Sequence, residues 1–139
     1  MDRHTPEQRR KNMKAIKNKD SKIELLLRKE LWCRNLHYRK NVKTVYGHPD
    51  IAFIGKKIAI FCDSEFWHGY HWDEQKETIH TRREFWIPKI ERNIQRDKEV
   101  TERLTNDGWI VLRFWGKEIQ TDVKKCADII QSVWENGHE

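Results

Sequence analysis

The stretch that decides the fold is Gly47-His-Pro-Asp-Ile-Ala-Phe-Ile-Gly-Lys-Lys-Ile-Ala-Ile-Phe-Cys-Asp-Ser-Glu-Phe-Trp-His-Gly-Tyr-His-Trp72. It predicts a β-hairpin with strands over Ile51–Ile54 and Ile58–Cys62, joined by a turn at residues 55–57. Both strands are almost entirely apolar. This pattern is typical of strands that are covered on both faces, as in the central sheet of an α/β protein.

Two carboxylates flank this hairpin. Asp50 opens the first strand and Asp63 follows the second, so an antiparallel pair brings them to the same open end. Pro49 fixes the backbone before Asp50. An ordinary Pro-Asp turn with a solvated carboxylate is the alternative. The aromatic and imidazole side chains of residues 66–72, directly after a buried strand, favour a functional site at this end.

Periodicity and capping signals predict the other elements. They are a basic helix over 5–17, a core helix from Ser21 to about Leu36, a strand over His37–Val45, a loop over 73–80, a helix from about 87 to 106, a strand over 109–115 and a closing helix from Thr121 to about Trp134. The order α, α, β, β, β, α, β, α describes one α/β domain.

One carboxylate falls on the inward stripe of the helix over 87–106. Asp97 shares this stripe with Ile90, Ile94 and Leu104. A carboxylate on a core-facing surface costs free energy unless it is paired or held at a site. A buried ion pair, for example with Arg113, and a functional role both remain open here.

Composition limits the class of protein. The 139 residues suffice for one domain, and 36% of them are charged. No apolar run approaches the roughly 20 residues of a membrane span, and the start lacks the apolar segment of a secretory signal. Cys33, Cys62 and Cys126 have no metal-type spacing, which fits a reducing cytosol. We therefore expect a cytoplasmic protein without membrane contact.

Positive charge is concentrated in the first third of the chain. Residues 1–44 contain 14 Lys and Arg and 5 Asp and Glu, a net charge of +9, whereas the whole chain carries +6. A solvated surface would explain such a run. A basic lobe is also the electrostatic signature of a nucleic-acid-binding protein, so residues 1–20 are expected to form a DNA-contacting arm.

Several strings together resemble the very short patch repair (Vsr) endonucleases. They occur in matching order over about residues 9–118: Asn12-Met-Lys-Ala-Ile16, Pro49-Asp50, Phe66-Trp-His68, Thr81-Arg-Arg-Glu-Phe-Trp86, Asn93-Ile-Gln-Arg-Asp97 and Gly108-Trp-Ile-Val-Leu112. The resemblance implies a restriction-endonuclease-like fold of the PD-(D/E)XK type, with a central mixed sheet and a core order α-β-β-β-α-β. It further implies a magnesium-dependent enzyme that nicks one strand of duplex DNA at a T:G mismatch.

The resemblance also assigns roles to individual residues. Asp50 and the backbone carbonyl of Cys62 would bind Mg²⁺, which prefers hard oxygen ligands. His68 and Asp97 would flank the attacking water and the scissile phosphate, and Asp63 completes the expected catalytic set. A monomer acting on mismatched duplex DNA is expected. Other mismatch-repair proteins are further candidate partners, and the enzyme would associate with the nucleoid when bound to DNA.

Apolar side chains that wedge into the base stack are implied at Met13, Phe66 and Trp67, and an ordinary core role is the alternative for the two aromatics. Lys11, Lys14 and Lys17 are expected to contact phosphates. A second interpretation of the whole chain is a catalytically altered DNA-binding module, or a nuclease of the same fold that recognises another DNA structure.

Two departures from the family pattern stand out. The second signature of the wider fold would place a carboxylate and a lysine where this chain has Phe61 and Asp63. The positions that match the structural zinc ligands of the family hold Glu65, Tyr70, Trp72 and Lys117, which are poor zinc ligands. We therefore expect no structural zinc, but a substitute tie made of a Glu65–Lys117 ion pair beside packed Tyr70 and Trp72.

Overall fold

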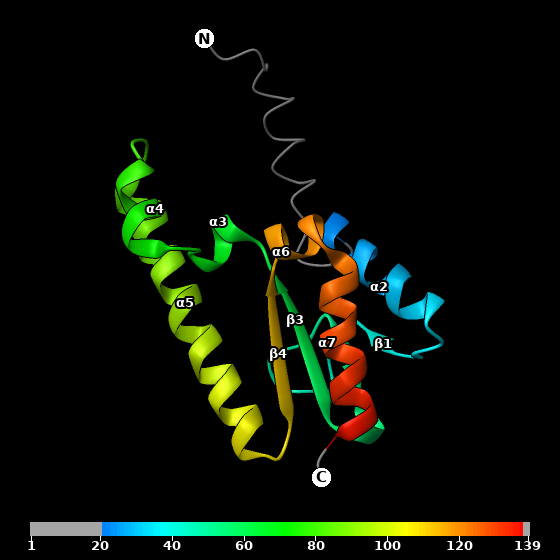
Figure 1. Ribbon diagram of the computed structural model, residues 1–139. Helices are drawn as coiled ribbons and strands as arrows, with labels where there is room; N and C mark the ends of the chain where they lie inside the picture. The colour runs from blue at the N-terminus through cyan, green and yellow to red at the C-terminus, as the bar shows by residue number, and fades with distance from the viewer. Residues whose placement is uncertain (1–20, 138–139) are drawn as a thin grey trace.

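A computed structural model describes residues 21–137 as a four-stranded mixed sheet between helices (Figure 1). The strands lie in the order β1 (Arg39–Lys40), β2 (Ile51–Phe53), β3 (Ile58–Asp63) and β4 (Ile110–Trp115). β2 is antiparallel to both of its neighbours, whereas β3 and β4 run parallel. The α/β class expected from the sequence is confirmed.

Helices cover both faces of the sheet. Helix α5 (Arg83–Asn106) lies on one face, and α2 (Lys22–Cys33) and α7 (Val123–Asn136) lie on the other (Figure 1). The short helices α3 (Glu65–His68) and α4 (Trp72–Thr78) follow β3 on the side of α5, and α6 (Gly116–Thr121) joins β4 to α7. None of the helices within residues 21–137 combines the length and the apolar composition that crossing a bilayer requires.

The predicted hairpin is confirmed. Ile51 of β2 pairs with Ile60 of β3, and a 3-10 turn over Ile54–Lys56 joins the strands, with Lys57 at a positive φ of 55°. Every residue of β2 and β3 is buried, as their apolar sequences require. Asp50 and Asp63 consequently lie at the same end of the hairpin.

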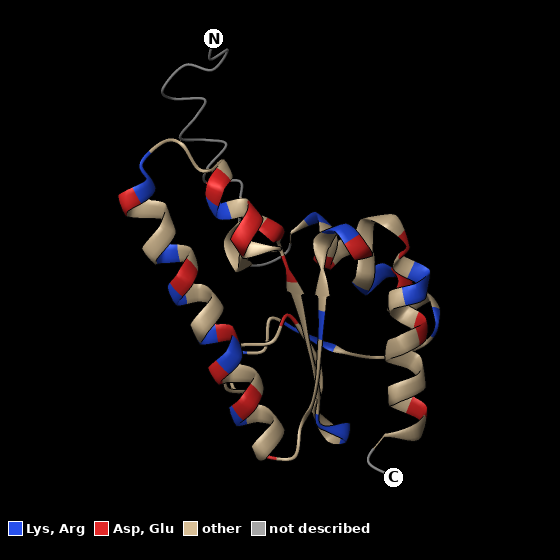
Figure 2. Cartoon of the chain, turned by 60° about the vertical axis from the view of Figure 1, so that its left-hand side comes forward, with Lys and Arg blue, Asp and Glu red and all other residues tan. Residues whose placement is uncertain are grey.

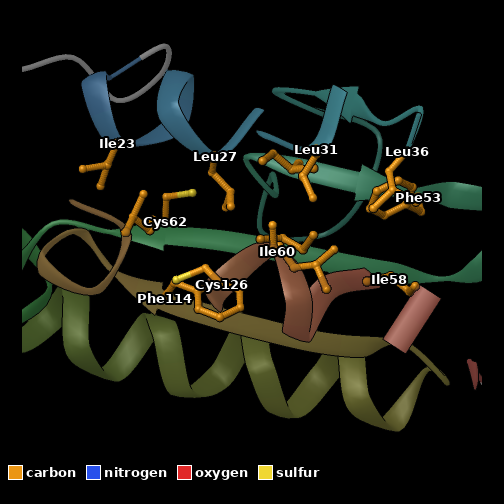
Figure 3. Close-up of a cluster of buried hydrophobic side chains, with 14 residues drawn as sticks. Ile23, Leu27, Leu31, Leu36, Phe53, Ile58, Ile60, Cys62, Phe114 and Cys126 are labelled. Carbon is orange, nitrogen blue, oxygen red and sulfur yellow. The ribbon is translucent and has the colours of Figure 1, made fainter. Parts of the chain in front are cut away.

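The core is divided between the two faces of the sheet. Ile23, Leu27 and Leu31 project from α2 onto the β3 side chains of Ile60 and Cys62 (Figure 3). Complete burial of each Leu or Ile contributes about 1.5 to 3 kcal/mol. The i, i+4, i+8 spacing on α2 was the sequence signal for this helix.

A second cluster fills the space under α5. Ala59 and Phe61 of β3 pack there against Val100 and Leu104 of α5. Because side chains alternate along a strand, Cys62 faces α2 and the next residue, Asp63, faces α5. Asp63 and Arg113 are the charged residues of β3 and β4, and both lie towards the carboxyl ends of these parallel strands. Most of the other charged residues lie on the helices (Figure 2).

Some predicted boundaries were wrong. β1 covers two residues rather than His37–Val45, because Asn41 adopts a positive φ of 48° that ends the strand. The predicted loop over 73–80 contains helix α4, whose residues are mostly exposed and therefore carry no apolar stripe. β2 ends at Phe53, one residue before the predicted end.

The long helix and the closing helix also differ from the prediction. α5 begins at Arg83 and continues through Pro88, which leaves only the exposed Glu84 carbonyl without its helical partner. The closing helix is α7, and the sequence assigned no element to the residues of the short helix α6 before it. Asp122, rather than Thr121, caps α7 by accepting a hydrogen bond from the backbone N–H of Lys125 at 3.1 Å.

The tie expected in place of zinc exists in a different form. The Glu65 carboxylate accepts a hydrogen bond from the backbone N–H of Lys117, in the first turn of α6, and no Glu65–Lys117 ion pair occurs between these two described side chains. Gly116 permits this contact, because a Cβ at that position would lie 3.2 Å from Glu65 Oε2. The expected ion pair is therefore wrong, but the two segments are joined.

The aromatic part of the tie involves Tyr70 but not Trp72. The Tyr70 ring meets the Trp115 ring edge to face, with 4.9 Å between centroids. Trp72 instead faces α5, where its indole N–H donates to Glu91 Oε2 at 3.3 Å. The predicted Tyr70–Trp72 cluster is thus wrong, since Trp72 opens α4 and binds α5, whereas Tyr70 packs on Trp115 of β4.

We predict that Glu65→Ala destabilises the protein by about 1 kcal/mol, the usual loss when a capping carboxylate is removed. Lys117→Ala is the matched control and should change stability by less than about 0.5 kcal/mol, because only the backbone of Lys117 takes part. Urea unfolding followed by tryptophan fluorescence measures both values. Equal destabilisation by the two variants would restore the ion-pair interpretation.

Candidate active site

Asp50 lies at the start of β2, beside the end of β3. Its Oδ2 accepts a hydrogen bond from the backbone N–H of Cys62 at 2.7 Å, and its backbone carbonyl accepts one from Asn41 at 2.9 Å. Pro49 before it is buried. The hairpin register and the stiff Pro49 therefore fix the Asp50 carboxyl against the backbone of β3, while the residue remains partly exposed to solvent.

Glu24 of α2 also lies at this site, although no motif in the sequence indicated it. Glu24 is only 3% exposed and makes a hydrogen bond with the Asp50 carboxyl. Its Oε2 also accepts a hydrogen bond from the backbone N–H of Ser21 at 2.7 Å, as in a capping box at the start of a helix. The overlooked signal was its position three residues before Leu27, on the buried side of α2.

Glu24 contributes to a shifted pKa at Asp50. Burial raises the pKa of Asp50 to about 9, the hydrogen bond with Glu24 adds to this rise, and the N–H of Cys62 opposes it. Asp50 therefore holds a proton at neutral pH when no cation is near. A divalent cation can take the place of that proton, because it lets both carboxylates ionise.

A second cluster lies on the α5 side of β3. Asp63 at the end of β3, His68 of α3 and Asp97 of α5 each offer a ligand atom, and these atoms lie within 4.8 Å of one another. His68 Nδ1 is 2.6 Å from Asp97 Oδ2 and 3.7 Å from Asp63 Oδ1. The structure thus brings together three of the residues that the sequence predicted for catalysis.

Arg113 of β4 joins this cluster. Its Nη1 lies 3.2 Å from both carboxylate oxygens of Asp63 and 3.7 Å from Asp97 Oδ1. Asp97 therefore pairs with Arg113, as one of the two interpretations proposed, and it also contacts His68; its functional role stays a prediction. A guanidinium touching both carboxylates makes this a hydrogen-bonded array suited to proton transfer rather than a metal cage.

Burial alone would lower the pKa of His68, but the hydrogen bond to Asp97 and the negative charge of Asp63 outweigh it. The pKa of the imidazole is therefore raised above its ordinary value. Burial also raises the pKa of Asp63, and the positive charges of His68 and Arg113 oppose this rise. Shifted pKa values in a neighbouring base and acid, here His68 and Asp63, are frequent at catalytic sites.

Beside His68 lies a group of partly exposed aromatic rings. Phe66 is 41% exposed, and its ring centroid is 5.1 Å from that of Trp67 and 5.4 Å from that of Trp86. Phe85 packs on Trp86 at 4.9 Å, and Lys89 Nζ lies 5.3 Å from the Trp67 ring. Phe66 and Trp67 thus form a surface cluster rather than part of either buried core.

Met13, Lys11, Lys14 and Lys17 lie outside the described residues.

Comparison with known proteins identifies the family. The family model described as DNA mismatch endonuclease Vsr matches residues 1–74. The type II nicking enzyme V.HpaIIP of Haemophilus parainfluenzae is 51% identical over 134 residues, which is 96% of this chain and 95% of the relative. The type II nicking enzyme V.NmeDIP of Neisseria meningitidis serogroup C is 50% identical and covers 96% and 90%. The DNA mismatch endonuclease Vsr of Escherichia coli (strain K12) is 36% identical and covers 87% and 80%. The chain therefore belongs to the Vsr family of DNA mismatch endonucleases.

Proposed function

We propose that this protein is a magnesium-dependent endonuclease that nicks one strand of duplex DNA at a T:G mismatch, as a monomer in the bacterial cytoplasm. The proposal rests on two different pairs of side chains that lie on opposite sides of the end of β3. A proton-holding carboxyl pair, Asp50 and Glu24, lies on one side of the strand end, and the hydrogen-bonded pair of His68 and Asp97 lies on the other.

Asp50, Glu24 and the backbone carbonyl of Cys62 would hold Mg²⁺. All three offer hard oxygen atoms. In an extended strand the N–H and C=O of one residue point to the same side, and the N–H of Cys62 points at Asp50. When bound, Mg²⁺ supplies Lewis-acid stabilisation of the negative charge that develops on the phosphate oxygens.

His68 would act as the general base. The Asp97 carboxylate holds the Nδ1 side of the imidazole at 2.6 Å, which fixes the ring and its tautomer and leaves Nε2 to accept a proton from the attacking water. Asp97 also stabilises the imidazolium that forms. Asp63 would act on catalysis indirectly, through its contacts with His68 and Arg113.

The aromatic cluster beside His68 would suit the protein to binding a distorted DNA duplex. Phe66 and Trp67 would insert between base steps together with Met13, and a mispaired step unstacks at the lowest free-energy cost. Lys11, Lys14 and Lys17 of the basic N-terminal arm would neutralise phosphates. We further propose that residues 1–139 form a single domain with the restriction-endonuclease-like core order. Other mismatch-repair proteins are candidate partners.

The direct test is nicking of a T:G duplex by Asp50→Asn and His68→Ala. We expect each variant to reduce the nicking rate by at least about 100-fold, because one removes a metal ligand and the other the base. Duplex affinity, measured by fluorescence anisotropy, should change less than about threefold, because neither side chain is needed to grip phosphates.

Asp73→Asn on the exposed helix α4 is the control for loss of an acidic charge, and it should nick at the wild-type rate. A T:A duplex and added EDTA control for mismatch and metal dependence. Wild-type rates for both site variants would place the active site elsewhere.

The raised pKa of His68 gives a pH-dependent prediction. A general base works when neutral, so the nicking rate at saturating Mg²⁺ should fall as the pH drops through a value above 6.5. Asp97→Asn removes the partner that stabilises the imidazolium and should move this acidic limb to lower pH, with a lower maximal rate. A pH–rate profile of the two proteins checks the shift, and an unmoved limb would exclude His68 as the titrating base.

A further inference from the structure

Arg113 uses its whole guanidinium group at the site. Nη1 binds Asp63, Nη2 donates to the backbone carbonyl of Asp97 at 3.2 Å, and Nε donates to Thr101 Oγ1 at 2.7 Å. The guanidinium carbon also lies 4.1 Å from the centre of the Phe61 ring, which covers one of its faces. Such a planar fork is fixed by its partners, so Arg113 ties β3 to α5 in one geometry.

The site needs the positive charge of Arg113 because of how the carboxylates of Asp63 and Asp97 are arranged. Both face the same nitrogen of His68, Asp97 at 2.6 Å and Asp63 at 3.7 Å. Asp63 is 5% exposed, so water cannot replace a missing partner there. Without Arg113, the buried Asp63 would compete with Asp97 for the single imidazole.

We propose that Arg113 is a positioning residue for DNA nicking: it satisfies Asp63 and anchors the backbone at Asp97, so that His68 stays hydrogen-bonded to Asp97 in one ring orientation. This inference rests on the proposed role of His68 as the base. It also accounts for Asp63 and Phe61, the two residues that depart from the signature of the wider fold. Asp63 is the anion that Arg113 pairs with, and Phe61 is the surface that it stacks on.

The test compares Arg113→Met, Asp63→Asn and the double variant. Arg113→Met should lower kcat for nicking by about 10- to 100-fold with a KM within about threefold of wild type, as for other supporting partners of a catalytic histidine. The double variant should recover at least about tenfold of that loss, because an uncharged amide in place of the Asp63 carboxylate no longer competes for His68. Arg103→Met, an exposed arginine elsewhere on α5, controls for loss of a positive charge.

Nuclear magnetic resonance can detect the hydrogen bond of the His68 ring directly, through the signal of its Nδ1 proton. The Nδ1 proton of His68, assigned by its absence in His68→Gln, should give one hydrogen-bonded signal in wild type and in the double variant, and a shifted or split signal in Arg113→Met. If Arg113→Met does not fold, the folded double variant still decides the matter, because it should keep both the signal and most of the nicking rate.

Wild-type nicking by Arg113→Met, or a folded double variant as slow as Arg113→Met, would overturn the inference. An unshifted Nδ1 signal in folded Arg113→Met would do the same. The resonance measurement does not depend on activity, so it separates this inference from the proposed function. A wild-type protein that nicks no duplex would contradict the proposed function while leaving the positioning of His68 to be decided by the resonance signal.

Discussion

The structure depends on β3 being enclosed on every side. It pairs with β2 on one edge and β4 on the other, and both of its faces are buried. Alternation along such a strand forces its last two residues to opposite faces. Cys62 therefore faces α2 while its N–H holds Asp50, and Asp63 faces α5 beside His68. The enclosed strand end separates the Asp50–Glu24 pair, where we propose that Mg²⁺ binds, from the His68–Asp97 pair, where we propose that a proton is transferred.

The pKa values in the two halves are raised for different physical reasons. The pKa of Asp50 is raised because burial and the neighbouring Glu24 disfavour its negative charge. The pKa of His68 is raised because Asp97 and Asp63 outweigh the effect of burial. Asp50 can therefore exchange its proton for a cation, whereas His68 can accept a proton from water only when its imidazole is neutral.

The elements that sequence predicted well are those with a local signal. The apolar runs of β2 and β3 specified the hairpin, and the hairpin alone placed Asp50 near Asp63. The inward spacing on α5 identified Asp97 as a carboxylate that needed a partner. Helix α4 escaped prediction because it buries too little of its surface to require an apolar stripe.

The residues that sequence missed are defined by contacts between distant segments. Glu24 carried a sufficient local explanation as a helix cap, so its contact with Asp50 could not be inferred. The sequence indicates Arg113 only as a possible partner of Asp97, whereas the side chain also binds Asp63, Thr101 and Phe61. The tie between Glu65 and α6 likewise uses a backbone N–H, which no side-chain pattern can reveal.

If Mg²⁺ binds at Asp50 and Glu24 as proposed, it displaces the proton that Asp50 holds. Calorimetric titration of the free protein with Mg²⁺ at pH 8, repeated in buffers of different ionisation enthalpy, counts the protons released. We expect release of about one proton for each ion bound, and no such release from Asp50→Asn. Binding of Mg²⁺ without proton release, with the same affinity in Asp50→Asn, would contradict it.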